Sequence, residues 1–167
     1  MSKHVLDIDE VTKFLRQSPP DSKIYLGADS SRFKRNGIWM AEFCICVCVH
    51  KSGRSGCKIF GEVVVERDYD QNRSRPSMRL MREATLLAET FHKLEHVLKD
   101  FYVELHIDMN PDKAHGSSCV VDQALGFLRS SCDVDVVASK PTEFSASASF
   151  AADRLVSILD DQRMAVA

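Results

Sequence analysis

The sequence predicts an α/β fold: a mixed five-stranded sheet, ordered 3-2-1-4-5 with strands numbered along the chain, and flanked by helices. Three apolar segments, at 23–29, 38–50 and 57–66, are separated only by short polar turns, which indicates an antiparallel meander. Two later apolar segments, at 101–109 and 134–139, alternate with helical patterns, which indicates parallel strands. The length of 167 residues suits a single domain, 1–167, with a short helical segment within residues 1–20.

Local signals set the expected boundaries of the first half. A short helix is expected at 9–17, because its apolar residues share one face and Pro19 and Pro20 stop it. The stretch "SSRFKRNG" (30–37) is expected to be a basic turn after the first strand. The stretch "KSGRSG" (51–56) is expected to be a second turn, before the third strand.

Three more helices are predicted after the meander. The first begins with Ser77 as its N-cap and ends near Lys99, with an apolar stripe at helical spacing formed by Leu80, Ala84, Leu87, Phe91, Leu94 and Leu98. The second covers about 119–129, after the loop "NPDKAHGSS" (110–118). The last covers about 143–160 and follows Lys140 and Pro141.

The six cysteines do not have the spacing of a metal site. Cys44, Cys46 and Cys48 alternate along one strand, where side chains two residues apart are separated by about 6.5–7 Å. Thiolates at about 2.3 Å from one zinc ion lie much closer together than that. We expect reduced cysteines that act as small buried hydrophobic residues.

The net charge and the hydropathy of the sequence limit the kinds of partner that the protein can have. The formal net charge of -2 and the pI near 6.3 exclude a globally basic nucleic-acid binder but allow a local basic patch. The N-terminus lacks the apolar run of a secretory signal, and no apolar run is long enough to span a bilayer. We therefore expect a cytoplasmic protein without a membrane partner.

Two aspartates end apolar strands and raise the question of function. Asp29 ends "KIYLGAD", and Asp108 follows "FYVELHI". A turn or capping role would explain each alone. Active sites of sheets with parallel strands, however, lie at the carboxyl ends of those strands. If the two strands are neighbours, the carboxylates repel unless a divalent cation lies between them.

Two further acids are candidates on helices. Glu83 lies at the edge of the apolar stripe, where it would either reach water, pair with Arg79 or Arg82, or serve as a third metal ligand. With two strand-end aspartates nearby, the ligand role is the better interpretation. Asp153 lies away from the apolar face of the last helix, and a solvated acid paired with Arg154 explains it equally well by pattern alone.

Four segments carry a resemblance to a known family: "YLGADSS", the "REA" around Glu83, "HIDMNP" and "KPTEFSASASFAADRL". With acids on the first strand, first long helix, fourth strand and last helix, the chain resembles the ribonuclease-H-like YkuK family, which has the ribonuclease H fold. The resemblance covers most of residues 23–155. It implies that Asp29, Glu83, Asp108 and Asp153 are both the catalytic residues and the metal ligands. The cysteine-rich second strand and the leading helix depart from the family pattern.

Four carboxylates can hold two Mg²⁺ or Mn²⁺ ions and hydrolyse a phosphodiester bond. Basic residues at the same edge of the sheet would contact the phosphate backbone: Arg32, Lys34, Arg35, Arg75, Arg79 and Lys140. His115 is a candidate for an auxiliary role, beside a plain surface role. The prediction is a divalent-metal-dependent nuclease acting on RNA, as an RNA–DNA hybrid or structured RNA. The alternatives are a resolvase-like DNA endonuclease and a catalytically inactive module that binds nucleic acid or protein. The sequence predicts no oligomeric state.

Overall fold

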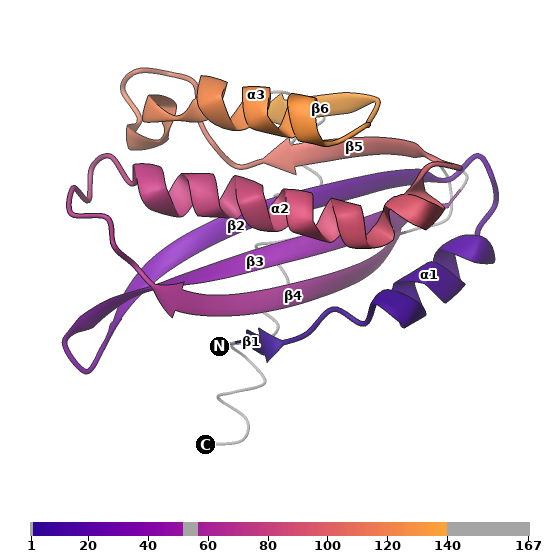
Figure 1. Ribbon diagram of the computed structural model, residues 1–167, viewed down its shortest axis with the longest axis horizontal. Helices are drawn as coiled ribbons and strands as arrows, with labels where there is room; N and C mark the ends of the chain where they lie inside the picture. Colours follow the sequence, from indigo (N-terminus) through magenta and orange to yellow (C-terminus); the bar gives the residue numbers. More distant parts are fainter. Residues whose placement is uncertain (1, 52–56, 140–167) are drawn as a thin grey trace.

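The structure is a computed structural model that describes residues 2–51 and 57–139. Six strands form one sheet in the order β1-β4-β3-β2-β5-β6 (Figure 1). The long strands are β2 (Lys23–Arg35), β3 (Ile38–His50) and β4 (Cys57–Arg67), followed by β5 (Tyr102–Ile107) and β6 (Val136–Ser139). These five occupy the predicted order, with β2 antiparallel to β3 and parallel to β5, so the predicted fold class is confirmed. The short β1 (Ser2–His4), which the sequence analysis missed, pairs with the edge of β4.

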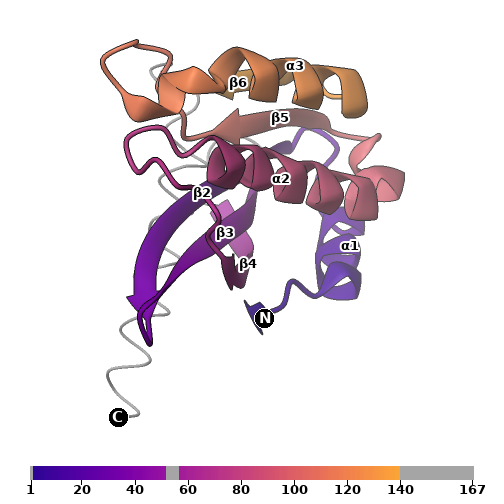
Figure 2. The ribbon, with the colours of Figure 1, turned by 60° about the vertical axis from the view of Figure 1, so that its left-hand side comes forward.

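Three helices cover one face of the sheet (Figures 1 and 2). They are α1 (Ile8–Arg16), α2 (Ser77–Leu98) and α3 (Val121–Ser131), and a single 3-10 turn, η1 (Gly116–Cys119), precedes α3. The helix α2 packs on β2, β3 and β5 and contacts both other helices. Its fully buried side chains, such as Leu87 and Leu94, meet Ile24 and Leu26 of β2 in one core. No helix of the described residues is both long and apolar enough to cross a membrane.

The cysteines of β3 lie on the sheet face opposite the helices. The register pairs Ile24 with Val49 and Leu26 with Val47 on the helix side, so Cys44, Cys46 and Cys48 point the other way. They are at most 5% exposed, which shows that both faces of β3 are covered. Cys132 is also buried, as predicted for a small hydrophobic residue, but Cys57 is exposed, and none of the six cysteines, all of which lie in the described residues, forms a disulfide.

The turn after the first strand is much shorter than predicted. β2 continues through Arg35 and pairs with β3 along its whole length, so only Asn36 and Gly37 remain for the turn. Both have positive φ values, 51° and 80°, which is the conformation of a two-residue hairpin that Asn-Gly favours. The polar and basic residues among positions 30–35 suggested a loop, whereas the backbone of this stretch pairs fully with β3.

The predicted N-cap of α2 is also wrong. The helix begins at Ser77, the preceding Pro76 offers no side-chain cap, and the first free amides are satisfied from a distance. Asp70 accepts hydrogen bonds from the amide nitrogens of Met78 at 2.9 Å and Arg79 at 2.8 Å. A carboxylate at this position also interacts favourably with the helix dipole. Asp70 therefore fixes the end of α2 that lies next to the ends of β2 and β5.

The capping role of Asp70 is testable against that of Ser77. Asp70→Ala removes both acceptors, and we expect it to lower the free energy of unfolding by about 1–2 kcal/mol, the usual range for a lost helix cap. Ser77→Ala removes no cap and is expected to change stability by less than about 0.5 kcal/mol. Urea denaturation of the two variants checks this, and a larger loss for Ser77→Ala than for Asp70→Ala would contradict it.

Candidate active site

The sheet brings Asp29 and Asp108 to the same edge. The parallel register of β2 and β5 ends with the pair Ala28 and Ile107, and the two aspartates are the next residue on each strand. Both side chains line a cavity of about 450 Å³ at this edge. The prediction that these two strands are neighbours is therefore confirmed, and the two aspartates line the same cavity.

Glu83 enters the same cavity from α2. Its side chain is buried, with 1% of the residue exposed, rather than reaching water at the edge of the helix. Its Oε2 accepts a hydrogen bond of 2.7 Å from the hydroxyl of Ser30, the residue that follows Asp29. Arg82, one of the two expected partners, binds Glu66 and Glu89 instead.

Arg79, the other expected partner of Glu83, lies inside the acidic cavity. Its guanidinium donates to the backbone oxygen of Ser30 at 2.6 Å and to the Ser30 hydroxyl at 2.7 Å. Ser30 thus connects the guanidinium to the Glu83 carboxyl. Because Glu83 and Arg79 are one helical turn apart on α2, this network attaches the start of the helix to β2.

The surroundings of Glu83 in the cavity change the pKa of its carboxyl. Burial, together with the nearby charges of Asp29 and Asp108, raises the pKa of its carboxyl to about 8, although the Ser30 hydrogen bond and Arg79 oppose the shift. Glu83 therefore holds a proton at neutral pH when no cation is bound. A shift of this size in a cavity is typical of functional sites.

The donor set of the cavity suits a hard divalent cation. Carboxylate oxygens are the ligands that Mg²⁺ and Mn²⁺ prefer, and three come from three separate elements. The Oε1 atom of Glu83 is buried without a hydrogen-bond partner among the described residues, which is costly unless a ligand or water occupies the space beside it. As the side chains lie, no three acids, histidines or cysteines in residues 2–51 and 57–139 are grouped closely enough to hold a metal ion. Binding would therefore require the carboxylates to turn toward one another.

A second cavity, of about 560 Å³, adjoins the acidic one. The two share Ser74, Ala114 and Gly116 in their linings, and the second also contains Arg75, Lys113 and His115. Gly116 is the point where the loop after β5 meets the loop before α2, because an added Cβ would lie 2.0 Å from the backbone oxygen of Ser74. Two of the predicted residues, Arg75 and His115, are thus brought beside the acids.

The remaining predicted basic residues lie along the β2–β3 hairpin. Arg32 forms a 2.8 Å ion pair with the buried Asp68, and its guanidinium also lies 4.4 Å from the ring centroid of Trp39. The ammonium of Lys34 lies over the same ring, and Arg35 lies over Phe33. Lys140 and Asp153 lie outside the described residues, as does the predicted last helix.

Glu104 and His106 lie on the opposite face of the sheet from the helices. Both are buried, and the Nε2 atom of His106 lies 2.8 Å from a Glu104 carboxylate oxygen. Burial lowers the pKa of His106 in spite of this carboxylate. These contacts give His106 a hydrogen-bonding role within the sheet.

A cavity larger than the acidic one does not contain the predicted acids. It has a volume of about 600 Å³, lies between β4 and α2, and shares only Arg79 with the acidic cavity. Two of its carboxylates are already paired, Glu66 with Arg82 and Asp68 with Arg32. In the acidic cavity, by contrast, the Oε1 atom of Glu83 has no hydrogen-bond partner among the described residues.

Sequence reasoning missed Ser30 and Asp70, which hold the site together. In the sequence Ser30 is one of two serines in an apparent turn, and Asp70 is one acid in the polar stretch 67–77. The alternation of β2 was the available signal: a residue after Asp29 must point to the other face, toward α2. For Asp70 no sequence signal was available, because its hydrogen-bond partners, the amides of Met78 and Arg79, lie eight and nine residues further along the chain.

The raised pKa of Glu83 predicts a pH-dependent stability in metal-free buffer. The unfolded chain loses this proton near pH 4.5, whereas the folded chain keeps it up to about pH 8. Glu83 therefore stabilises the fold fully below pH 4.5, and this contribution disappears as the pH rises to 8, by an amount on the order of a few kcal/mol. Glu83→Gln should remove this decline and be more stable than the wild type at pH 8.

Urea denaturation with EDTA between pH 4.5 and 8.5 measures the difference between the two proteins. Glu10→Gln, at an exposed glutamate of α1, is the matched control and should follow the wild-type curve. Parallel curves for Glu83→Gln and the wild type would show that Glu83 is already ionised in the folded protein.

Comparison with known proteins places the chain in a family. No curated protein matches its sequence. One solved structure, described as the crystal structure of LC9-RNase H1, a type 1 RNase H with the type 2 active-site motif, is similar at 16% sequence identity and a TM-score of 0.41, covering 83% of this chain and 72% of that one. A profile of the family described as Ribonuclease H-like matches residues 7–156. Since this match spans most of the chain, the protein belongs to the ribonuclease H-like family.

Proposed function

We propose that the protein is a divalent-metal-dependent nuclease whose catalytic carboxylates are Asp29, Glu83, Asp108 and Asp153. The observation that carries the proposal is the acidic cavity: three carboxylates from β2, α2 and the end of β5 share it, and a buried oxygen of Glu83 has no described hydrogen-bond partner. A merely structural glutamate at this place would have both oxygens satisfied. Membership of the ribonuclease H-like family agrees with nuclease chemistry.

Asp29, Glu83 and Asp108 would hold the metal, with Asp153 as the fourth ligand implied by the family resemblance. When bound, two Mg²⁺ or Mn²⁺ ions neutralise the charge of the scissile phosphodiester and acidify the attacking water. Glu83 would have to lose its proton to hold a cation, so binding should strengthen as the pH approaches 8. Arg79 and Ser30 keep the Glu83 carboxyl next to β2 through their hydrogen bonds.

The substrate we propose is RNA, as an RNA–DNA hybrid or structured RNA, with phosphates of the bound strand beside the acids. The adjoining cavity supports a phosphodiester rather than a neutral substrate, because Arg75, Lys113 and His115 line it and no acid does so among the described residues. Cations beside a metal site attract the polyanion without competing for the metal ligands. Within the family, the segments around Asp29, Glu83 and Asp108 lead us to propose the YkuK branch.

Replacing Asp29 separates this function from a structural role. Asp29→Asn keeps an acceptor for the amide of Ser30, which its carboxylate now binds at 2.7 Å, but removes a negative charge. We expect loss of hydrolysis, together with unchanged or higher thermal stability in metal-free buffer, because like-charge repulsion is relieved. Magnesium should raise the melting temperature of the wild type by mass action and do much less for Asp29→Asn or Asp108→Asn.

The measurement combines thermal melts with a labelled panel of RNA–DNA hybrid, structured RNA, single-stranded RNA and branched DNA, in Mg²⁺, Mn²⁺ or EDTA. Glu10→Gln again serves as the control that removes an acidic charge away from the cavity. Cleavage of branched DNA alone would identify a resolvase-like enzyme. A wild type that cleaves nothing and does not respond to either metal would leave the chain as a binding module.

A further inference from the structure

The only tryptophan of the chain lies among three cations. Trp39 of β3 pairs across the hairpin with Lys34 of β2. Its ring centroid lies 4.2 Å from the guanidinium carbon of Arg73, 4.4 Å from that of Arg32 and 5.0 Å from the ammonium of Lys34. We call these four residues the Trp39 cluster. Each cation is attracted to the ring face, but three like charges around one ring repel one another.

The carboxylates near the cluster neutralise only one of its cations. Asp68 is buried against Arg32, at 2.8 Å, and the Asp70 carboxylate is occupied by the amides that begin α2. Lys34 and Arg73 are exposed, and no carboxylate in the described part of the chain forms an ion pair with either. One cation would be enough to cover the ring. The remaining two present unneutralised positive charge to solvent.

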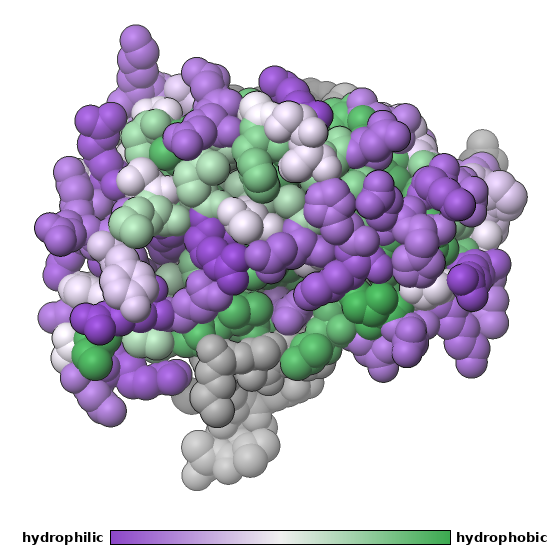
Figure 3. All heavy atoms as spheres, viewed as in Figure 1, coloured by the Kyte–Doolittle hydropathy of each residue, from purple (hydrophilic) through white to green (hydrophobic). Residues whose placement is uncertain are grey.

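The cluster is continuous with the acidic cavity. Arg73 lines that cavity and also covers Trp39, so one side chain belongs to both. Along β2, Lys34 is five residues beyond Asp29, a distance of roughly 16 Å at the usual rise of a strand. Figures 1 and 2 show the β2–β3 hairpin extending past the first turn of α2, and hydrophilic side chains predominate on that side of the molecule in Figure 3.

From this arrangement we infer a second contact with the substrate, which rests on the proposed nuclease function. Lys34 and Arg73 bind phosphates of the substrate strand where it leaves the acidic cavity and passes along the β2–β3 hairpin. Trp39 is a positioning residue that holds the two cations over its ring, as aromatic and basic side chains combine in grooves that bind single strands. Arg32, which forms an ion pair with the buried Asp68, packs against the Trp39 ring and helps to hold it in place.

Tryptophan emission locates the contact directly. Because Trp39 is the only tryptophan, its fluorescence reports on this cluster and on no other place in the protein. Titration of the wild type, in EDTA, with a structured RNA that carries a single-stranded extension should change the emission in step with binding, which is measured separately by the anisotropy of the dye-labelled RNA. Working without metal keeps the measurement independent of cleavage.

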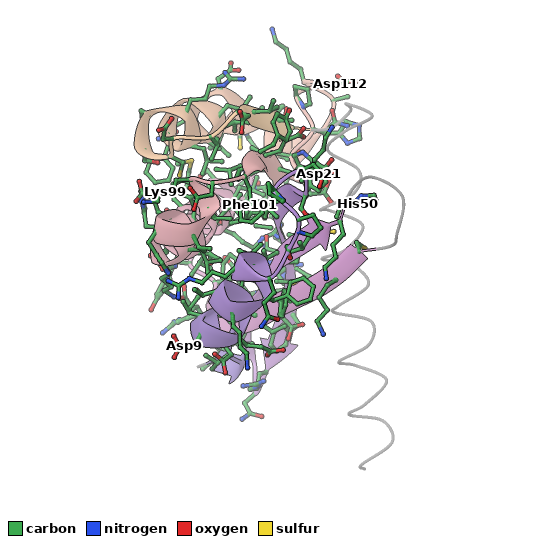
Figure 4. All side chains as sticks on the ribbon, turned by 90° about the vertical axis from the view of Figure 1, so that its right-hand side faces the viewer. Asp9, Asp21, His50, Lys99, Phe101 and Asp112 are labelled. Carbon is green, nitrogen blue, oxygen red and sulfur yellow. The ribbon has the colours of Figure 1, made fainter. Side chains whose placement is uncertain are left out.

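The salt dependence of binding, measured after removal of the two charges, tests the phosphate contacts. In the double variant Lys34→Ala with Arg73→Ala, the slope of log affinity against log salt should fall by about 1.4, since each phosphate contact on a single strand contributes about 0.7. The matched control, Arg16→Ala with Lys93→Ala, removes the same charge from exposed positions. These lie on α1 and the later part of α2, at the end of the molecule that Figure 4 faces, and should leave the slope unchanged. The charge-conserving pair Lys34→Arg with Arg73→Lys should restore the wild-type slope.

The outcomes separate this inference from the proposed function. Binding by the wild type with unchanged Trp39 emission, or an equal slope in the Lys34 and Arg73 double variant, overturns the inference and leaves the nuclease intact. A reduced slope in a protein that cleaves nothing with any metal supports the inference and overturns the catalytic proposal. A wild type that binds no nucleic acid overturns both. Circular dichroism and melting temperature verify that each variant is folded.

Discussion

The hydrogen bond between Ser30 and Glu83 is the contact on which the candidate site depends. It joins the central strand β2 to the long helix α2 at the edge of the sheet where β5 also ends. A glutamate that is only 1% exposed tolerates burial because this hydroxyl and the nearby Arg79 offset part of the lost hydration. Asp70 holds the helix at the same end, so the position of Glu83 relative to Asp29 is fixed from both sides. The site is thus built into the packing of the fold rather than onto a surface loop.

This arrangement leaves the cation-free protein with an electrostatic imbalance. Asp29 and Asp108 lie side by side, and both raise the pKa of Glu83. The Glu83 carboxyl therefore stays protonated at neutral pH. Replacing that proton by a divalent cation would satisfy the orphaned Oε1 atom and neutralise the two aspartates at once. Functional sites commonly retain such locally unfavourable groups at the expense of stability. The sheet and α2 supply the compensating burial, with Leu26, Leu87 and Leu94 fully enclosed in the core.

The basic residues divide into two kinds that their sequence positions do not distinguish. Arg32 forms an ion pair with Asp68, and Arg82 forms ion pairs with Glu66 and Glu89. Arg79 donates a hydrogen bond to Ser30. The guanidinium groups of these three arginines are therefore engaged in contacts within the fold. Lys34, Arg73 and Arg75 are exposed, and the first two share the face of Trp39. The positive charge that is exposed beside the acids therefore comes from side chains such as these three, and not from every basic residue of the surrounding sequence. A chain with a net charge of -2 can still present a basic path.

The sequence by itself determined the strand order and the edge at which Asp29 and Asp108 meet. Hydrophobic periodicity and short turns restrict the topology strongly, and the alternation of strands with helices makes the later strands parallel. Local patterns also located α2 and placed Glu83 at the edge of the apolar face of this helix. They did not reveal the length of β2, because the polar residues at its end have the composition of a turn although their backbone is fully paired with β3. Only the tertiary structure decided that Glu83 is buried against Ser30, that Asp70 rather than Ser77 caps α2, and that Arg32 pairs with Asp68. The physical reason is that these contacts join residues from 8 to 53 positions apart, and their geometry is set by how the helix packs on the sheet and not by any local preference of the chain.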